Sequence, residues 1–135
     1  MIHIITIANK LKERPVMSKT NTKEDALNIA KEIVKALDEK KAEDIKTLDI
    51  SNVSVMADYF IIASGNNRNQ LQAICDNVIE KLHKTGHDLK QVEGYDTANW
   101  ILMDYGDVIV HIFDKENRLF YDLERIWSDG KEVVI

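Results

Sequence analysis

The stretch that decides the fold of this chain is residues 100–127, WILMDYGDVIVHIFDKENRLFYDLERIW. Trp100–Asp104 and Val108–Phe113 are two apolar strand patterns separated by a short turn. The turn contains Tyr105-Gly106, and glycine suits the positive φ that such a turn requires, so the pattern predicts a β-hairpin. The second strand reads VIVHIF, which is almost continuously apolar and favours a central position in a sheet.

Helix signals follow the hairpin and also precede it. After Asp114, a candidate N-cap, apolar residues at helical spacing predict a last helix that includes Leu119–Trp127. A first helix is predicted after the polar segment 20–22, and a second one after Gly65-Asn66-Asn67, with Gly86 as its C-terminal stop. The remaining strands are predicted at Ile45–Ile50, Asp58–Ser64 and Asp88–Val92.

This order of elements predicts one α/β domain with a mixed five-stranded sheet flanked by helices. The strand–helix–strand unit within Asp58–Val92 predicts a parallel pair joined by a right-handed crossover. The hairpin adds antiparallel pairing to the same sheet.

The composition is that of a globular domain in a reducing compartment. The chain has 135 residues, of which 44% are hydrophobic and 30% charged, and a single cysteine excludes a disulfide framework. We therefore expect a cytoplasmic protein, and no apolar run is long enough to span a membrane. Residues 1–16 place the apolar run Ile2–Ala8 before Lys10, Lys12 and Arg14, the reverse of a signal peptide. With Met17 as a plausible start, we expect 1–16 to be a poorly ordered upstream extension and 17–135 to be the domain.

Charge is distributed unevenly along the chain. Residues 93–135 contain ten acidic and four basic residues, a net charge of −6, whereas residues 1–92 carry thirteen acidic and fourteen basic residues, a net +1. An acidic C-terminal part repels phosphate backbones, which argues against direct nucleic-acid binding, and it attracts a basic protein partner.

The acidic residues do not form a recognisable catalytic spacing. Asp104 and Asp107 flank the hairpin turn and Asp114 precedes a helix, so turn and cap roles account for all three. Phosphoryl transfer would need converging carboxylates and a phosphate-binding loop. The candidate loop, residues 64–67, has one glycine and no lysine. We therefore predict that the protein is not an enzyme and uses no cofactor.

The histidines and the cysteine give weak signals for a metal or a nucleophile. His111 shares a strand face with Ile109 and Phe113, so it is either a core histidine or a polar contact in a partner-binding face. His83 and His87 are separated by the helix-ending Gly86, which argues against a shared metal ion. Cys75 lies on an apolar helical stripe, where we expect it to be buried and inert.

Trp100 is the strongest candidate for a partner contact. It opens a strand that we expect at an exposed edge, just after a loop, and it alternates with Leu102 and Asp104. Together with Tyr105 and the acidic turn, it fits an aromatic interface anchor with an acidic rim.

Several separate blocks of the sequence resemble one family. ADYFIIASGN, LQAICDNV, VEG, WILMDYGDVIVHIF and YDLERIW, in this order, closely resemble the ribosomal silencing factors (RsfS, also called Iojap). The resemblance covers residues 26–129. Residues 1–16 lie outside it, and Asn67 stands where the family often has serine.

The resemblance implies an α/β fold similar to nucleotidyltransferases, without established catalysis, and a homodimer when free. It implies binding to the large ribosomal subunit through ribosomal protein L fourteen, which blocks joining of the small subunit and represses translation when nutrients are scarce. The implied contact patch centres on Trp100, Asp104 and Tyr105, with Leu102 and His111 supporting it. The alternatives are a factor that assembles the large subunit and a nucleotide-processing enzyme that retains the ancestral fold.

Overall fold

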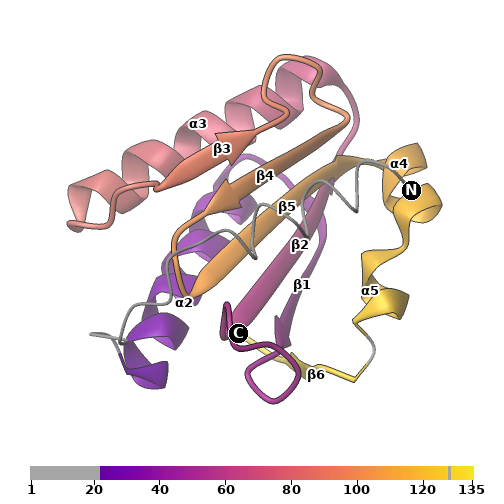
Figure 1. Ribbon diagram of the computed structural model, residues 1–135. Helices are drawn as coiled ribbons and strands as arrows, with labels where there is room; N and C mark the ends of the chain where they lie inside the picture. Colours follow the sequence, from indigo (N-terminus) through magenta and orange to yellow (C-terminus); the bar gives the residue numbers. More distant parts are fainter. Residues whose placement is uncertain (1–21, 128) are drawn as a thin grey trace.

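The computed structural model describes residues 22–127 and 129–135 (Figure 1). The expectation for residues 1–16 therefore concerns a part of the chain outside the described residues. No described helix is long and apolar enough to cross a membrane. The elements, in chain order, are α2 (Lys23–Glu39), β1 (Glu43–Asp49), β2 (Tyr59–Gly65), α3 (Arg68–Lys84), β3 (Gln91–Glu93), β4 (Trp100–Asp104), β5 (Val108–Asp114), α4 (Lys115–Tyr121), α5 (Leu123–Ile126) and β6 (Lys131–Val133).

The strands form one mixed sheet in the order β3-β4-β5-β2-β1-β6. The predicted α/β class and mixed pairing are confirmed, because β2 and β5 pair in parallel while every other neighbouring pair is antiparallel. The sheet has a sixth strand that we did not predict. β6 pairs with β1 through Thr47 and Val133, and its three residues are too few to show a period-2 pattern.

The predicted parallel pair within Asp58–Val92 is wrong. The parallel neighbour of β2 is β5, and β3 lies at the far edge of the sheet, so the crossover through α3 passes over two strands. Burial explains the order: β5 is buried along nearly its whole length and takes the centre, whereas β3 has exposed residues and suits an edge.

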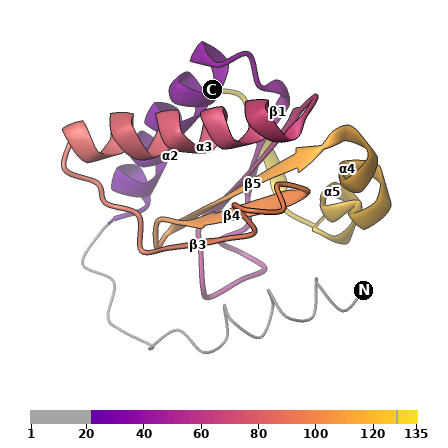
Figure 2. The ribbon, with the colours of Figure 1, turned by 90° about the horizontal axis from the view of Figure 1, so that it is seen from above.

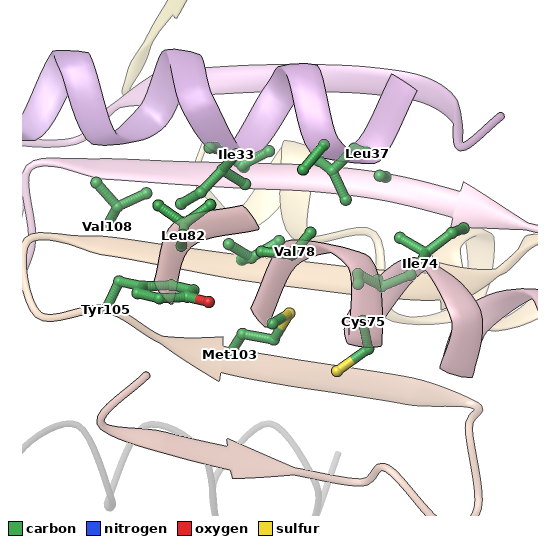
Figure 3. Packing of buried hydrophobic residues seen from close by; sticks show 14 of the residues in the cluster. Ile33, Leu37, Ile74, Cys75, Val78, Leu82, Met103, Tyr105 and Val108 are labelled. Carbon is green, nitrogen blue, oxygen red and sulfur yellow. The ribbon is translucent and has the colours of Figure 1, made fainter. Parts of the chain in front are cut away.

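Helices α2 and α3 lie together on one face of the sheet, which we call the helix face (Figure 2). Its core is mainly aliphatic, and Ile33 and Leu37 of α2 pack above Ile74 and Val78 of α3 (Figure 3). Strand residues at alternate positions, such as Ile101 and Met103 of β4, fill the space beneath these helices.

Local capping chemistry sets the helix ends largely as the sequence predicts. The Asn67 side chain accepts a hydrogen bond from Gln70 N at 2.8 Å and caps α3, and Gly86 follows that helix with a φ of +88°. The single last helix is wrong, because Asp122 adopts a left-handed conformation with φ +46° and divides it into α4 and α5. Aspartate is one of the few residues that tolerate this conformation.

Candidate functional site

The predicted hairpin is confirmed, with β4 and β5 joined by a tight turn. Gly106 has a φ of +92°, and the Asp104 carboxylate accepts a hydrogen bond from Gly106 N at 2.7 Å. Tyr105 N donates to Val108 O at 3.0 Å and closes the turn. Asp104 therefore has the turn role that its position indicated, and it is buried, with an exposed fraction of 4%.

Trp100 is not at an exposed edge, contrary to our expectation. β3 lies outside β4 in the sheet, and the Trp100 side chain is only 3% exposed. Its ring centroid lies 4.8 Å from that of Phe113 and 4.6 Å from that of Tyr121. The sequence around Trp100 could not show this burial, because a strand becomes internal only when another segment of the chain pairs beside it.

Trp100 and His111 form a buried hydrogen-bonded pair. The indole Nε1 donates to Nδ1 of His111 at 3.0 Å, so the imidazole proton of the neutral ring belongs on Nε2. Burial lowers the pKa of His111 to about 3, which keeps the ring neutral at physiological pH. Nε2 is itself buried, and no described residue accepts a hydrogen bond from it.

His111 is thus a core histidine, but its partner is an indole, not the backbone carbonyl or acid that we considered. The register could have indicated this contact. Trp100 stands opposite Phe113, so His111 is two positions along the facing strand and on the same face. Such diagonal neighbours lie within reach of large aromatic side chains.

We call the buried cluster of side chains around this pair the Trp100 face. It lies on the opposite side of the sheet from α2 and α3. The His111 ring centroid is 4.8 Å from that of Phe60, which is 5.0 Å from that of Trp127. Leu102 belongs to the same cluster and is 3% exposed. The sequence did not point to Phe60 or Tyr121 as members, because they reach this face from β2 and α4.

Tyr105 lies on the other side of the sheet, among residues of the helix face (Figure 3). Its ring lies near Met103 and Leu82, and burial raises the pKa of its hydroxyl above the ordinary value. The hydroxyl oxygen is buried without a hydrogen-bond partner among the described residues. Trp100 and Tyr105 therefore do not share one patch, as the period-2 alternation of strand side chains requires.

The candidate carboxylates do not converge. Asp107 precedes β5 and Asp114 ends it, so the two lie at opposite ends of one strand. Asp114 caps α4 by accepting from Asn117 N at 2.8 Å. Within residues 22–127 and 129–135, no group of three or more His, Cys, Asp or Glu side chains could hold a metal ion.

The other candidate residues have local partners. His83 Nδ1 lies 2.5 Å from Asp88, while His87 lies 3.5 Å from Glu32, so the two histidines face different acids. Cys75 is fully buried as predicted, and burial raises the pKa of its thiol to about 12.

The polar groups of the candidate anion-binding loop, residues 64–67, form hydrogen bonds within the protein. Ser64 Oγ accepts a hydrogen bond from Arg118 Nη1 at 2.7 Å, and Asn66 N donates to the Gln70 side chain at 2.7 Å. These contacts, with the Asn67 cap, join the end of β2 to α3 and α4.

Comparison with known proteins gives consistent relationships. The family model described as "Ribosomal silencing factor during starvation" matches residues 23–135. Ribosomal silencing factor RsfS of Bacillus subtilis is 44% identical over 103 residues, covering 76% of this chain and 87% of that protein. A crystal structure of a Chromobacterium violaceum protein superposes with a TM-score of 0.75 at 33% identity, covering 82% of this chain and 91% of that one.

A more distant similarity is to the mouse protein named mitochondrial assembly of ribosomal large subunit protein 1. It is 28% identical over 100 residues, which are 71% of this chain and 43% of that protein.

Proposed function

The chain belongs to the ribosomal silencing factor family, and from this premise we propose that it represses translation by occupying the large ribosomal subunit. It docks through ribosomal protein L fourteen and sterically excludes the small subunit when nutrients are scarce. It acts in the bacterial cytoplasm and forms a homodimer when free. The mechanism is occlusion, without covalent chemistry.

The observation that carries this proposal is the family match over residues 23–135. The charge distribution supports it, since residues 93–135 carry a net −6 and suit a basic ribosomal protein. Separation of Asp107 from Asp114 along β5 further favours binding over carboxylate-based catalysis.

Within this proposal the five candidate contact residues take two roles. Trp100, Leu102 and His111 build the Trp100 face, whereas Asp104 and Tyr105 hold the hairpin turn and its packing on the helix face. Because the first three side chains are 1–3% exposed, direct contact with them requires local opening when the large subunit binds.

Co-sedimentation with purified large subunits, followed by a subunit-joining assay, tests the proposal. Wild-type protein should pellet with large subunits and reduce joining. Trp100→Phe keeps a large ring but removes the N–H to His111, and it should weaken binding. Trp127→Phe alters another tryptophan of the same aromatic cluster and is the matched control. Wild-type protein that stays in the supernatant would end the proposal.

A second candidate function is assembly of the large subunit. The name of the mouse relative favours it, at 28% identity. The two functions separate in cells that lack the protein: accumulation of large-subunit precursors during growth supports assembly, while normal precursors with excess subunit joining during starvation support silencing.

A further inference from the structure

Helices α4 and α5, which we call the strap, pack against the Trp100 face. In Figure 1 they follow one another along the side of the sheet, from the end of β5 toward β6. The ring centroid of Tyr121 in α4 lies 4.6 Å from that of Trp100, and Leu123 in α5 belongs to the same buried cluster. Among the described helices, only these two contribute side chains to that cluster.

The structure of the strap depends on its contact with the sheet. Helix α4 has seven residues and α5 has four, and helices this short are not stable by themselves in water. Asp122 separates them in a left-handed conformation, and its side chain does not cap α5. The strap is therefore a segment of low local stability, which opens more readily than the strands beneath it.

Two basic residues of α4 fasten the strap to the sheet outside the Trp100 face. Arg118 Nη1 donates to Ser64 Oγ of β2 at 2.7 Å and to Glu43 O of β1 at 3.4 Å. Lys115 Nζ lies 2.7 Å from the Glu43 carboxylate, and both of these side chains are partly exposed. Neither Ser64 nor Glu43 belongs to the cluster around Trp100. These anchors can therefore be weakened without changing the side chains of the Trp100 face.

The Trp100 face also contains a polar atom that lacks a partner. His111 accepts the indole proton of Trp100 on Nδ1, so its own proton is on Nε2, which is buried and has no acceptor among the described residues. Burying an N–H group without an acceptor destabilises the closed arrangement. Opening of the face relieves this cost, because the N–H then reaches water or an acceptor on a bound partner.

On the basis of the proposed function, we propose that the strap is a cover that regulates the docking site. It closes the Trp100 face in the free protein, held by Arg118 and Lys115, and it lifts when the large subunit binds. In the open state Trp100 and Leu102 contact a protein of the large subunit, and Nε2 of His111 donates to an oxygen atom of that protein. Since only the open form binds, its population in the free protein sets the apparent affinity.

Weakening the anchors tests this regulation in co-sedimentation with purified large subunits. Arg118→Met removes the hydrogen bonds to β1 and β2 and should raise the affinity about fivefold, because the open form becomes more populated. Lys115→Met removes only an exposed ion pair and should raise the affinity about twofold.

Arg125→Met is the matched control for the loss of charge. Arg125 also lies in the strap and is exposed, but its ion pair, with Asp122 at 3.3 Å, is internal to the strap. This variant loses the same charge as Arg118→Met without releasing the strap from the sheet, so its affinity should equal that of wild type. Melting temperatures verify the fold, and Lys115→Met remains readable if Arg118→Met does not fold.

Hydrogen exchange reports on the opening itself. The amides of Asp122 and Arg125 donate within the strap, to Arg118 O and Asp122 O. In free Arg118→Met these amides should exchange faster than in wild type, while the amides of β5 stay protected. In the complex of wild type with large subunits, the same two amides should also exchange faster than in the free protein.

The possible results separate this regulation from the proposed function. If wild type binds large subunits but Arg118→Met and Lys115→Met bind no more tightly than Arg125→Met, the strap is not a cover and the proposed function stands. Unchanged exchange of the strap amides in the complex leads to the same conclusion. If wild type does not bind large subunits, both proposals are wrong.

Discussion

The helix face and the Trp100 face of the same sheet are packed by different kinds of side chain. On the helix face, aliphatic residues such as Ile33 and Leu82 fill the space under α2 and α3. On the Trp100 face, aromatic rings surround a buried Trp100–His111 hydrogen bond. Dispersion and burial of apolar area account for most of the first face, where Asn77 of α3 also donates a buried hydrogen bond to Ala36 O of α2 at 2.8 Å. The second face is centred on a hydrogen bond between two aromatic side chains.

This difference shows that one hairpin contributes side chains to two packing layers of different character. Ile101 and Met103 face the helices while Trp100 and Leu102 face the other way, so the same five-residue strand contributes to both layers. Aliphatic packing tolerates volume-conserving exchange. A buried polar pair is less tolerant, because removing one partner leaves the other desolvated and unpaired.

The largest effect is expected from truncating the aromatic ring that defines the Trp100 face. Trp100→Ala should lower the free energy of unfolding by about 3–5 kcal/mol, as loss of a buried tryptophan leaves a cavity. Ile33→Ala, at a fully buried position of the helix face, should cost about 2–5 kcal/mol. Urea unfolding measures both. A loss below about 1 kcal/mol for Trp100→Ala would mean that this face is not a packed core.

The next largest effect is expected in the pH dependence of stability, which should come from the Trp100 face because that face contains His111. Burial lowers the pKa of His111 to about 3 in the folded state, while the unfolded chain titrates near the ordinary value of about 6.5. Above pH 6.5 both states are neutral and the stability is fully present. Below it the unfolded state takes up the proton first, so stability falls by about 3 kcal/mol between pH 7 and pH 4.

His111→Phe removes that titration and is the control for it. The difference in unfolding free energy between wild type and this variant should shrink as the pH falls from 7 to 4, measured by urea unfolding at each pH. A constant difference would contradict a neutral, buried imidazole.

A smaller effect is expected when the Trp100–His111 hydrogen bond is removed but a large aromatic ring is kept. Trp100→Phe should cost about 1–3 kcal/mol, because Nδ1 of His111 loses its donor while most of the packing remains. In a His111→Leu background the same change should cost less, and the double-mutant cycle gives the coupling. Additive costs would show that the pair contributes no polar coupling.

The smallest effect is expected at Tyr105, the aromatic residue of the hairpin turn that packs on the helix face. Tyr105→Phe removes a buried hydroxyl that has no hydrogen-bond partner among the described residues. The change should be neutral or stabilising by up to about 1 kcal/mol. A clear loss of thermal stability would reveal a partner for that hydroxyl and make the two faces more alike.

Much of the local structure could be predicted because the signals are local. Gly106 and Asp104 form the turn that their positions indicated, and Asn67 and Asp114 cap their helices. The last helix was predicted as continuous, since nothing in the apolar spacing marks the left-handed Asp122.

The candidate site was predicted less well than the elements that carry it. All five contact residues lie in or beside the hairpin, as expected, but grouping Trp100 with Tyr105 ignored the alternation that sends them to opposite faces. The exposure expected for Trp100 depended on β4 being an edge strand, and β3 takes that place. The docking role of these residues stays a prediction.

The sequence by itself determined the hairpin, the two long helices, the acidic C-terminal part and the family resemblance. These follow from turn chemistry, periodicity and charge, which act over a few residues. Only the tertiary structure decided the strand order, the addition of β6, the partner of His111 and the burial of Trp100. Each of these depends on which distant segments pair, and pairing is set by the burial of whole strands, a property that no short stretch of sequence carries.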